Sequence, residues 1–221
     1  MEYLFDKQEL RNLNPAGEHC ILLTNGLGGY ASVTEGYGVN RCDQGLLIAA
    51  LRSPNVRQTM VHRMRETLRV EGRDYALSSQ KFGDSTPGED SREALCSFRY
   101  EYVPCWTYEI GGVRVRRQMA MAWERNTVAL LYTVENRSSQ DCTLEAEPFV
   151  KFAPKEQARK RKIKLRLEGN RLLGGGTGLY IQTDGALSPW ENAWQWLSYP
   201  EDQKDGRWAR GLCGSGCRIT K

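Results

Sequence analysis

The stretch that decides the fold is WTYEIGGVRVRRQMAM, residues 106–121. Apolar and polar side chains alternate on both sides of Gly111-Gly112, as in two strands with one buried face each. Two consecutive glycines supply the positive φ angles that a two-residue hairpin turn needs. The stretch therefore predicts a β-hairpin.

The same alternation extends outward over most of the chain. Short apolar or alternating runs are separated by Gly, Pro, Asn and Asp, and no stretch of about 12 residues shows a convincing helical period. A brief helix is expected only within the first ten residues. Strands are expected at residues 45–51, 58–70, 97–103, 127–136, 142–152 and 178–185. Two further segments, 70–77 and 163–173, are expected to form strands with turns at Gly72 and at Gly169-Asn170.

Closely spaced strands without intervening helices favour an antiparallel sandwich over a parallel βαβ sheet. A chain of 221 residues buries roughly 70% of its unfolded surface, enough for one large core. We therefore expect an all-β protein, a large antiparallel β-sandwich that forms a single domain over residues 1–221.

The glycine-rich segment ILLTNGLGGYAS, residues 21–32, matches the G-x-G-x-x-A pattern of dinucleotide-binding loops. Such loops work because a helix starts at once and directs its amides at the phosphates. Here SVTEGYGVNR follows, with two more glycines and β-branched residues, which is a poor helix start. We expect instead that Gly28 or Gly29 has a positive φ or lies against a neighbouring backbone. The sequence GGGTG, residues 174–178, is expected to be a mobile hairpin loop.

Composition restricts the environment of the protein. The chain contains no apolar stretch of the ~20 residues that a membrane helix needs, and its first residues lack a secretory signal. Seven cysteines at irregular spacing indicate reduced thiols, and Cys213 and Cys217 are the only close pair. A structural zinc site usually needs two such pairs. We expect a cytoplasmic protein with no metal, no cofactor and no membrane partner.

Several segments together resemble the bacterial and archaeal glycogen debranching enzymes, the amylo-α-1,6-glucosidases. The likeness covers nearly the whole chain except residues 147–161, and two long ordered segments make it specific. The similar segments are LLTNGLGGYAS (22–32), GLLIAA (45–50), residues 62–82, residues 97–136 and WQWLSYPEDQKDGR (194–207).

The resemblance implies a fold and a division of labour. In that family the N-terminal strands form a large β-sandwich, of the type also attached to glucoamylases and disaccharide phosphorylases. The carboxylates that cleave the glycosidic bond belong to a following α/α barrel, which this chain does not contain. The resemblance therefore implies a non-catalytic N-terminal domain that contributes to α-glucan binding and docks the barrel, and that is inactive alone.

The acidic residues agree with this expectation. Glycoside hydrolysis needs two carboxyl groups roughly 5–9.5 Å apart on either side of one bond. No pair in the sequence suggests such a site, and we expect no catalytic residue. The acids interpreted as solvated surface groups are Glu89, Asp90, Glu101, Glu109, Glu135 and Glu145.

Candidate sugar contacts combine polar and aromatic side chains, because a pyranose offers both hydroxyl groups and an apolar face. Each candidate also has a structural alternative, namely turn capping for Asn25 and core packing for Trp194, Trp196 and Trp106. The expected substrate-binding residues, for glycogen or a malto-oligosaccharide bound weakly, are Asn25, Gly28, Gly29, Arg41, Asp43, Gln44, Trp190 and Trp194.

Two departures from the family bear on this site. Asp43-Gln44 stand where relatives have an aromatic residue and a histidine. After Pro148, the sequence FVKFAPKEQARKRK replaces a stretch with arginine and histidine. If those positions contact sugar in relatives, the contact is altered or lost here.

The segment 155–166 carries seven basic residues and a single acid, Glu156. An alternative function is therefore binding of a polyanion or nucleic acid by this basic strand. The segment itself contains no aromatic side chain, which favours a solvated strand face or a domain-contact patch instead.

Overall fold

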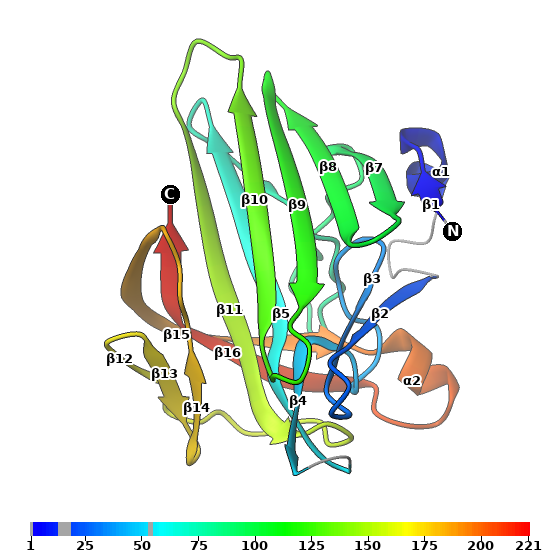
Figure 1. Ribbon diagram of the computed structural model, residues 1–221, viewed down its shortest axis with the longest axis vertical. Coiled ribbons are helices and arrows are strands. Elements are labelled where there is room, and N and C mark those ends of the chain that lie inside the picture. The colour runs from blue at the N-terminus through cyan, green and yellow to red at the C-terminus, as the bar shows by residue number, and fades with distance from the viewer. Residues whose placement is uncertain (1, 13–18, 53–54) are drawn as a thin grey trace.

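The computed structural model describes residues 2–12, 19–52 and 55–221. Strands dominate these residues, and the two helices are short (Figure 1). In chain order the elements are β1 (Tyr3–Phe5), α1 (Lys7–Asn12), β2 (Cys20–Thr24), β3 (Tyr30–Thr34), β4 (Gly45–Arg52), β5 (Val56–Val70), β6 (Arg73–Ala76), β7 (Leu95–Tyr100), β8 (Pro104–Ile110), β9 (Val113–Met121), β10 (Val128–Asn136), β11 (Cys142–Pro154), β12 (Arg166–Glu168), β13 (Arg171–Gly174), β14 (Thr177–Tyr180), β15 (Ala186–Ser198), α2 (Pro200–Lys204) and β16 (Arg210–Thr220).

Two antiparallel sheets pack together as a sandwich, as predicted. The small sheet has the order β1-β7-β8-β9-β10. The large sheet has the order β15-β16-β11-β5-β4-β3-β2, with β6 paired to β5 as its eighth strand. A separate three-stranded sheet, β12-β13-β14, lies beside β15 and β16 (Figure 1).

The hairpin predicted at residues 106–121 is present as β8 and β9. Its turn is closed by Gly111 and Gly112, which both have positive φ (54° and 80°), between the paired residues Ile110 and Val113. Every second side chain of β8 is buried, and Trp106 is fully buried with its indole N–H donated to the carbonyl of Glu35 (2.7 Å). The core alternative for Trp106 is therefore confirmed.

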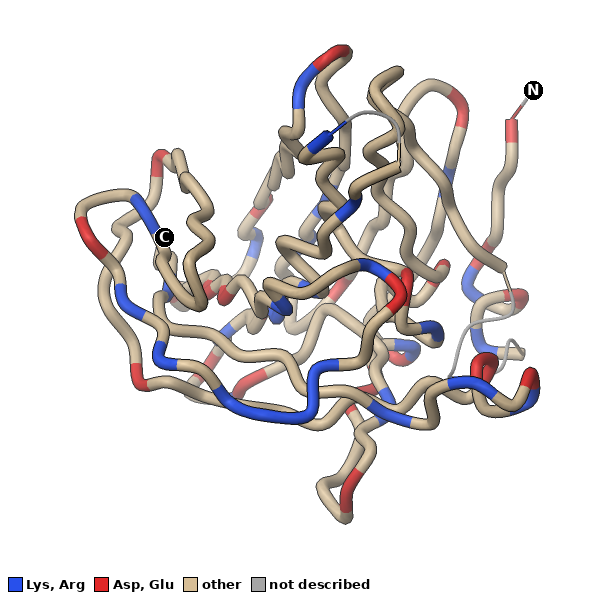
Figure 2. The backbone as a smooth tube through the Cα atoms, turned by 90° about the horizontal axis from the view of Figure 1, so that it is seen from below, with Lys and Arg blue, Asp and Glu red and all other residues tan. Residues whose placement is uncertain are grey.

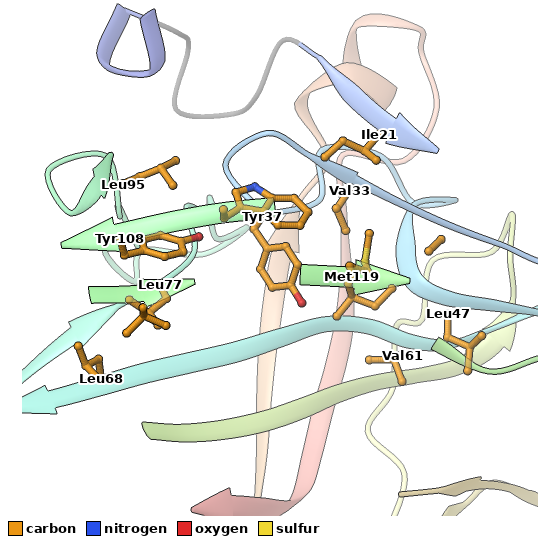
Figure 3. Packing of buried hydrophobic residues seen from close by; sticks show 14 of the residues in the cluster. Ile21, Val33, Tyr37, Leu47, Val61, Leu68, Leu77, Leu95, Tyr108 and Met119 are labelled. Atoms are coloured by element: carbon orange, nitrogen blue, oxygen red, sulfur yellow. The ribbon is translucent and has the colours of Figure 1, made fainter. Parts of the chain in front are cut away.

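The main core fills the space between the two sheets (Figure 3). Tyr108 and Met119 enter it from the small sheet, and Val61 and Leu68 from the large sheet. Burial of such apolar surface contributes about 25 cal/mol per Å², so this layer is the main source of stability.

An ion pair crosses this core and was not predicted. Arg117 lies at an inward position of β9, and its Nη1 is 3.4 Å from Oε2 of Glu66 on β5, with both side chains fully buried. Tyr132 donates its hydroxyl to the other oxygen of Glu66 (2.6 Å), and the Arg117 guanidinium stacks on the ring of Tyr37 (3.2 Å). The pair links the two sheets, because Glu66 belongs to the large sheet and Arg117 to the small one. Removing one partner of such a buried pair typically costs about 3–5 kcal/mol.

Several predicted boundaries were wrong. Strand 97–103 ends at Tyr100, because the chain turns there to pair Tyr100 with Pro104, and Tyr102 is 85% exposed in the turn. In the predicted segment 163–173 the turn at Gly169-Asn170 is present between β12 and β13, but residues 163–165 lie outside any strand and β12 begins only at Arg166. At the N-terminus, the expected helix starts at Lys7, after a short strand.

The interpretation of two acids as solvated groups was also wrong. Glu89 lies in a loop that returns to β5, where Arg63 and Ser78 both donate to its carboxylate. Glu145 projects from β11 beside Arg218 (3.0 Å), on the outer face of the large sheet. In both cases an arginine on a neighbouring strand removes the acid from bulk water, which local sequence does not reveal.

Candidate functional site

The loop between β2 and β3 is organised by Asn25. Its side chain is fully buried, and Oδ1 accepts hydrogen bonds from the backbone N–H groups of Leu27 and Gly29 (both 2.9 Å). Its Nδ2 donates to the carbonyl of Arg125 (3.0 Å) in the β9–β10 turn. The amide is therefore engaged in holding the loop, which is the turn-capping alternative.

The glycines of this loop permit a close approach of backbone, as predicted. Gly28 has φ +91°, a conformation that disfavours other residues. A Cβ on Gly29 would lie 2.6 Å from Nδ2 of Asn25 and 3.0 Å from the carbonyl oxygen of Ile48. The next residue, Tyr30, begins strand β3 and no helix, so the loop is not a phosphate-binding turn.

Trp123 completes this region and was missed by the sequence analysis. It lies in the β9–β10 turn, 69% exposed, with its ring against Gly26, where an added Cβ would be 2.7 Å from the ring. Gly26 has φ +78°. No local signal distinguishes Trp123 from the other tryptophans, because its partner Gly26 is distant in sequence.

A second group, the Arg41 cluster, lies where the β3–β4 loop meets α2 and the turn after it. We define it as Arg41, Asp43, Asp202, Asp205 and Arg207. Nη1 of Arg41 is 2.5 Å from Asp205 and 3.3 Å from Asp202, and Nη1 of Arg207 is 3.4 Å from Asp202 and 3.9 Å from Asp43.

Burial within the Arg41 cluster is uneven. Asp202 is fully buried and accepts the backbone N–H of Cys42 (2.8 Å), whereas the other four members are partly exposed. The hydrogen bond and charge of Arg41 lower the pKa of Asp205. The cluster thus presents guanidinium and carboxylate groups at the surface. Each such planar group can form two charge-assisted hydrogen bonds with neighbouring hydroxyl groups of a ligand.

Gln44 lies next to the cluster but does not reach its surface. Its Oε1 accepts the backbone N–H groups of Asn40 (2.7 Å) and Arg41 (3.1 Å), and the residue is buried. Like Asn25, it fixes a loop. Tyr30 ties the two loops together, since its hydroxyl donates to the carbonyl of Asp43 (2.6 Å).

Two buried basic side chains form the floor beneath the Arg41 cluster. Lys151 on β11 donates to the carbonyls of Cys42 (2.7 Å) and Lys155 (3.0 Å), and burial lowers its pKa. His62 on β5 donates Nδ1–H to the carbonyl of Gln44 (2.9 Å) and accepts the hydroxyl of Tyr199 at Nε2 (2.7 Å). Burial lowers the pKa of His62 well below its ordinary value, so the ring is neutral.

The predicted tryptophans lie elsewhere. They belong to β15, and four strands separate β15 from β3 in the large sheet. Trp190 is 40% exposed, whereas Trp194 packs on Gly214 and the main core, and Trp196 lies under Arg210. The structure therefore divides the predicted contacts among three places: the Asn25 loop, the Arg41 cluster and β15.

The basic segment 155–166 is not a strand, which corrects the premise of the polyanion alternative. Only Arg166 belongs to a strand, because Arg159 folds back and donates to the carbonyls of Lys151 and Phe152 (both 2.6 Å). An aromatic from outside the segment, Trp208, lies under Lys160 (5.0 Å). Basic and acidic residues are interspersed along the backbone (Figure 2).

Thiols and potential metal ligands are the remaining candidates for chemistry. The seven cysteines are free thiols, and Cys42, Cys213 and Cys217 are buried. Within residues 2–12, 19–52 and 55–221, no group of three or more His, Cys, Asp or Glu side chains is placed to hold a metal ion. None of the helices described is long and apolar enough to cross a membrane.

Comparison with known proteins identifies the family. A search of curated proteins found no match to the chain. The family model of the glycogen debranching enzyme N-terminal domain, however, matches residues 19–215, which include the Asn25 loop, the Arg41 cluster and most of both sheets. On this evidence the chain belongs to the glycogen debranching enzyme N-terminal family.

Proposed function

We propose that the chain is the non-catalytic β-sandwich of a glycogen debranching enzyme, and that it contributes to α-glucan binding and docks the catalytic barrel. The observation that carries this proposal is the family match over residues 19–215. The sugar contacts are assigned to the Arg41 cluster rather than to the Asn25 loop.

The chemistry of the Arg41 cluster supports this assignment. Sugar hydroxyl groups pair with planar charged groups that donate or accept two hydrogen bonds in fixed directions. Asp43, Asp205 and Arg207 are partly exposed and are held in place by ion pairs. Trp208 follows Arg207 directly and adds an aromatic face, anchored by its indole N–H to the carbonyl of Glu156 (2.8 Å).

The two departures from the resembling family support the same location. Asp43-Gln44 and the stretch after Pro148 are far apart in sequence, yet Lys151 of that stretch donates to the carbonyl of Cys42. The two departures therefore meet beside the Arg41 cluster, and a sugar contact at this place is expected to differ from that of relatives.

Binding by this domain alone should be weak. Association must offset roughly 4–15 kcal/mol of lost translational and rotational freedom, and half of the proposed site belongs to the barrel. We expect a dissociation constant for maltoheptaose on the order of 1 mM. No glucose release from α-1,6-branched glucan is expected from the chain alone, because the catalytic carboxylates are assigned to the barrel and the acids of the Arg41 cluster are paired with arginines.

The test is calorimetric titration with maltoheptaose, alongside a glucose-release assay. Arg207→Gln should weaken binding about tenfold, equivalent to about 1.4 kcal/mol, and Arg41 would still neutralise Asp202. The matched control is Arg116→Gln, an exposed arginine on β9 of the small sheet.

Two results would contradict the proposal. Equal affinities of the wild type and Arg207→Gln for maltoheptaose would show that the Arg41 cluster does not contact the sugar. Glucose release by the pure chain, abolished by substitution of one of its own acids, would contradict the non-catalytic role. Binding of a polyanion such as heparin, with no binding of maltoheptaose, would favour the alternative function of segment 155–166.

A further inference from the structure

Trp190 lies in a β-bulge of the edge strand β15. The register passes from the pair Pro189–Cys217 to the pair Ala193–Ser215, so β15 advances by more residues than β16. The extra residues leave the ladder and turn Trp190 out of the core, 40% exposed. Bulges of this kind occur at sheet edges and next to sites, where they redirect a side chain.

One face of the Trp190 ring is held by Arg218. The guanidinium centre is 3.3 Å from the ring centroid. Nε and Nη2 of Arg218 donate to one oxygen of Glu147 (2.9 and 2.6 Å), and Nη1 is 3.0 Å from Glu145. Because three of its nitrogens are engaged, Arg218 cannot turn away, and the ring is fixed before any ligand arrives.

The surrounding charges form a balanced network on the outer face of the large sheet. Arg65 donates to the second oxygen of Glu147 (2.5 Å), and Arg69 pairs with Asp74 (2.7 Å). The network consists of three guanidinium and three carboxylate groups: Arg65, Arg69, Arg218, Asp74, Glu145 and Glu147. Its net charge is zero, so it favours a neutral polar ligand over a polyanion.

A fixed indole beside such a network matches the needs of a pyranose ring. The apolar face of the sugar stacks on the aromatic ring, while its hydroxyl groups bond to Arg69 and Asp74, the members of the network whose side chains are about half exposed. Because Arg218 stacks on the ring and is itself held by two carboxylates, less side-chain entropy is lost on binding.

This region is separate from the Arg41 cluster. Trp190 lies eight residues before Ser198, the last residue of β15, and α2 with Asp202 follows that end. Because the bulge takes up two of these residues, the separation along the strand is roughly 20 Å at about 3.3 Å per residue. One sugar unit cannot contact both places.

We propose that Trp190 and its charged network form a second contact for α-1,4-linked glucan, which holds a different length of chain from the Arg41 cluster. The inference rests on the proposed function for its choice of sugar. Two linked contacts on one polymer raise its apparent affinity without any new interaction at the first site.

The experiment uses the complete 221-residue chain labelled with ¹⁵N, in which each of the six tryptophans gives one indole N–H signal. Single Trp→Phe variants assign the signals. Titration with maltoheptaose should shift the signals of Trp190 and Trp208 saturably. Arg207→Gln should suppress the Trp208 shift and leave the Trp190 shift intact.

Variants of the second contact give the reverse pattern. Trp190→Ala, and Arg218→Lys, which keeps the charge but loses the planar fork, should leave the Trp208 shift unchanged. Arg218→Lys should weaken the response of Trp190 several-fold. The matched control is Trp123, which is more exposed than Trp190 and packs on Gly26, and its signal should not move.

Each contrary outcome has a definite meaning. A silent Trp190 with a shifting Trp208 would overturn the second contact and leave the proposed function standing. Joint loss of both shifts in Arg207→Gln would show one site instead of two, and equal shifts of Trp123 and Trp190 would show unspecific stacking; either overturns the inference. A shift of Trp190 with a silent Trp208 supports the second contact and contradicts the site assigned above.

Discussion

The Asn25 loop and the β3–β4 loop that carries Arg41 and Asp43 flank the same strand, β3, and residues of both loops were predicted from sequence as sugar contacts. In the loop, the Asn25 amide is buried and engaged with backbone groups on both sides. In the cluster, the buried acid Asp202 anchors a set of charged side chains that stay partly exposed. The polar groups of the Asn25 loop are bonded within the loop and its neighbour, whereas those of the Arg41 cluster remain partly exposed to solvent.

The difference shows what makes a polar residue available to a ligand. A short amide close to its own backbone finds intramolecular partners first, because an unpaired buried N–H costs about 1–3 kcal/mol. Longer charged side chains on two meeting loops satisfy one another only in part. The two regions therefore differ in the number of donor and acceptor atoms that intramolecular hydrogen bonds leave available to a ligand, rather than in residue type.

The largest effect on stability is expected from Asn25→Ala. The change leaves the N–H groups of Leu27 and Gly29 without their acceptor, so the free energy of unfolding should fall by about 3 kcal/mol. Urea denaturation measures the loss. The control is Asn136→Ala, an exposed asparagine on β10, which should cost less than about 1 kcal/mol. Similar losses in the two variants would remove the distinction drawn for the loop.

A smaller effect is expected from Gly29→Ala. The new methyl group would lie 2.6 Å from Asn25 and 3.0 Å from the Ile48 carbonyl, so the loop must shift at a cost of about 2 kcal/mol. A methyl group added at Gly216 or Gly88 would also contact neighbouring atoms. Gly72 faces open space, so the control variant Gly72→Ala carries only the penalty of its positive φ. Thermal unfolding of both variants separates steric contact from backbone strain. A Gly29→Ala protein as stable as the wild type would contradict the close approach.

The buried His62 beneath the Arg41 cluster should make the free energy of unfolding depend on pH. His62 is neutral when folded, because burial lowers its pKa well below 6.5, whereas the unfolded chain takes up a proton near that value. The unfolded state therefore binds more protons as pH falls below about 6.5, and the free energy of unfolding drops by up to about 1.4 kcal/mol per pH unit. Denaturant titrations between about pH 7 and 5 measure this slope. In His62→Gln the slope should be shallower, and an unchanged slope would rule out His62 as its source.

Much of the fold was predictable because alternation fixes which face of a strand is buried. The hairpin at Gly111-Gly112, the burial of Trp106 and the exclusion of a phosphate loop all follow from local pattern. Arg117 occupies an inward position of the same pattern, but its partner Glu66 lies on the other sheet. Which charged residues enter the core depends on such long-range pairing, and local sequence does not encode it.

The site was harder to predict for a related reason. Arg41 and Asp43 were expected to act near Asn25, and Tyr30 does tie the two loops together. Their actual ion-pair partners, Asp205 and Arg207, are more than 150 positions away and come from the turn after α2. Trp190 was assigned to the same site, although a bulge on β15 directs it elsewhere. Residue types were sufficient to select candidate sugar contacts, but they did not show which of these residues lie together in the folded chain.

The central claim is that α-glucan binds at the Arg41 cluster and not at the Asn25 loop, and backbone amide NMR during a maltoheptaose titration tests it most directly. The account predicts saturable shifts at residues 41–43 and 205–208, and unchanged signals at residues 25–29. Shifts that are largest at residues 25–29, or no saturable shift at residues 41–43 and 205–208, would contradict it.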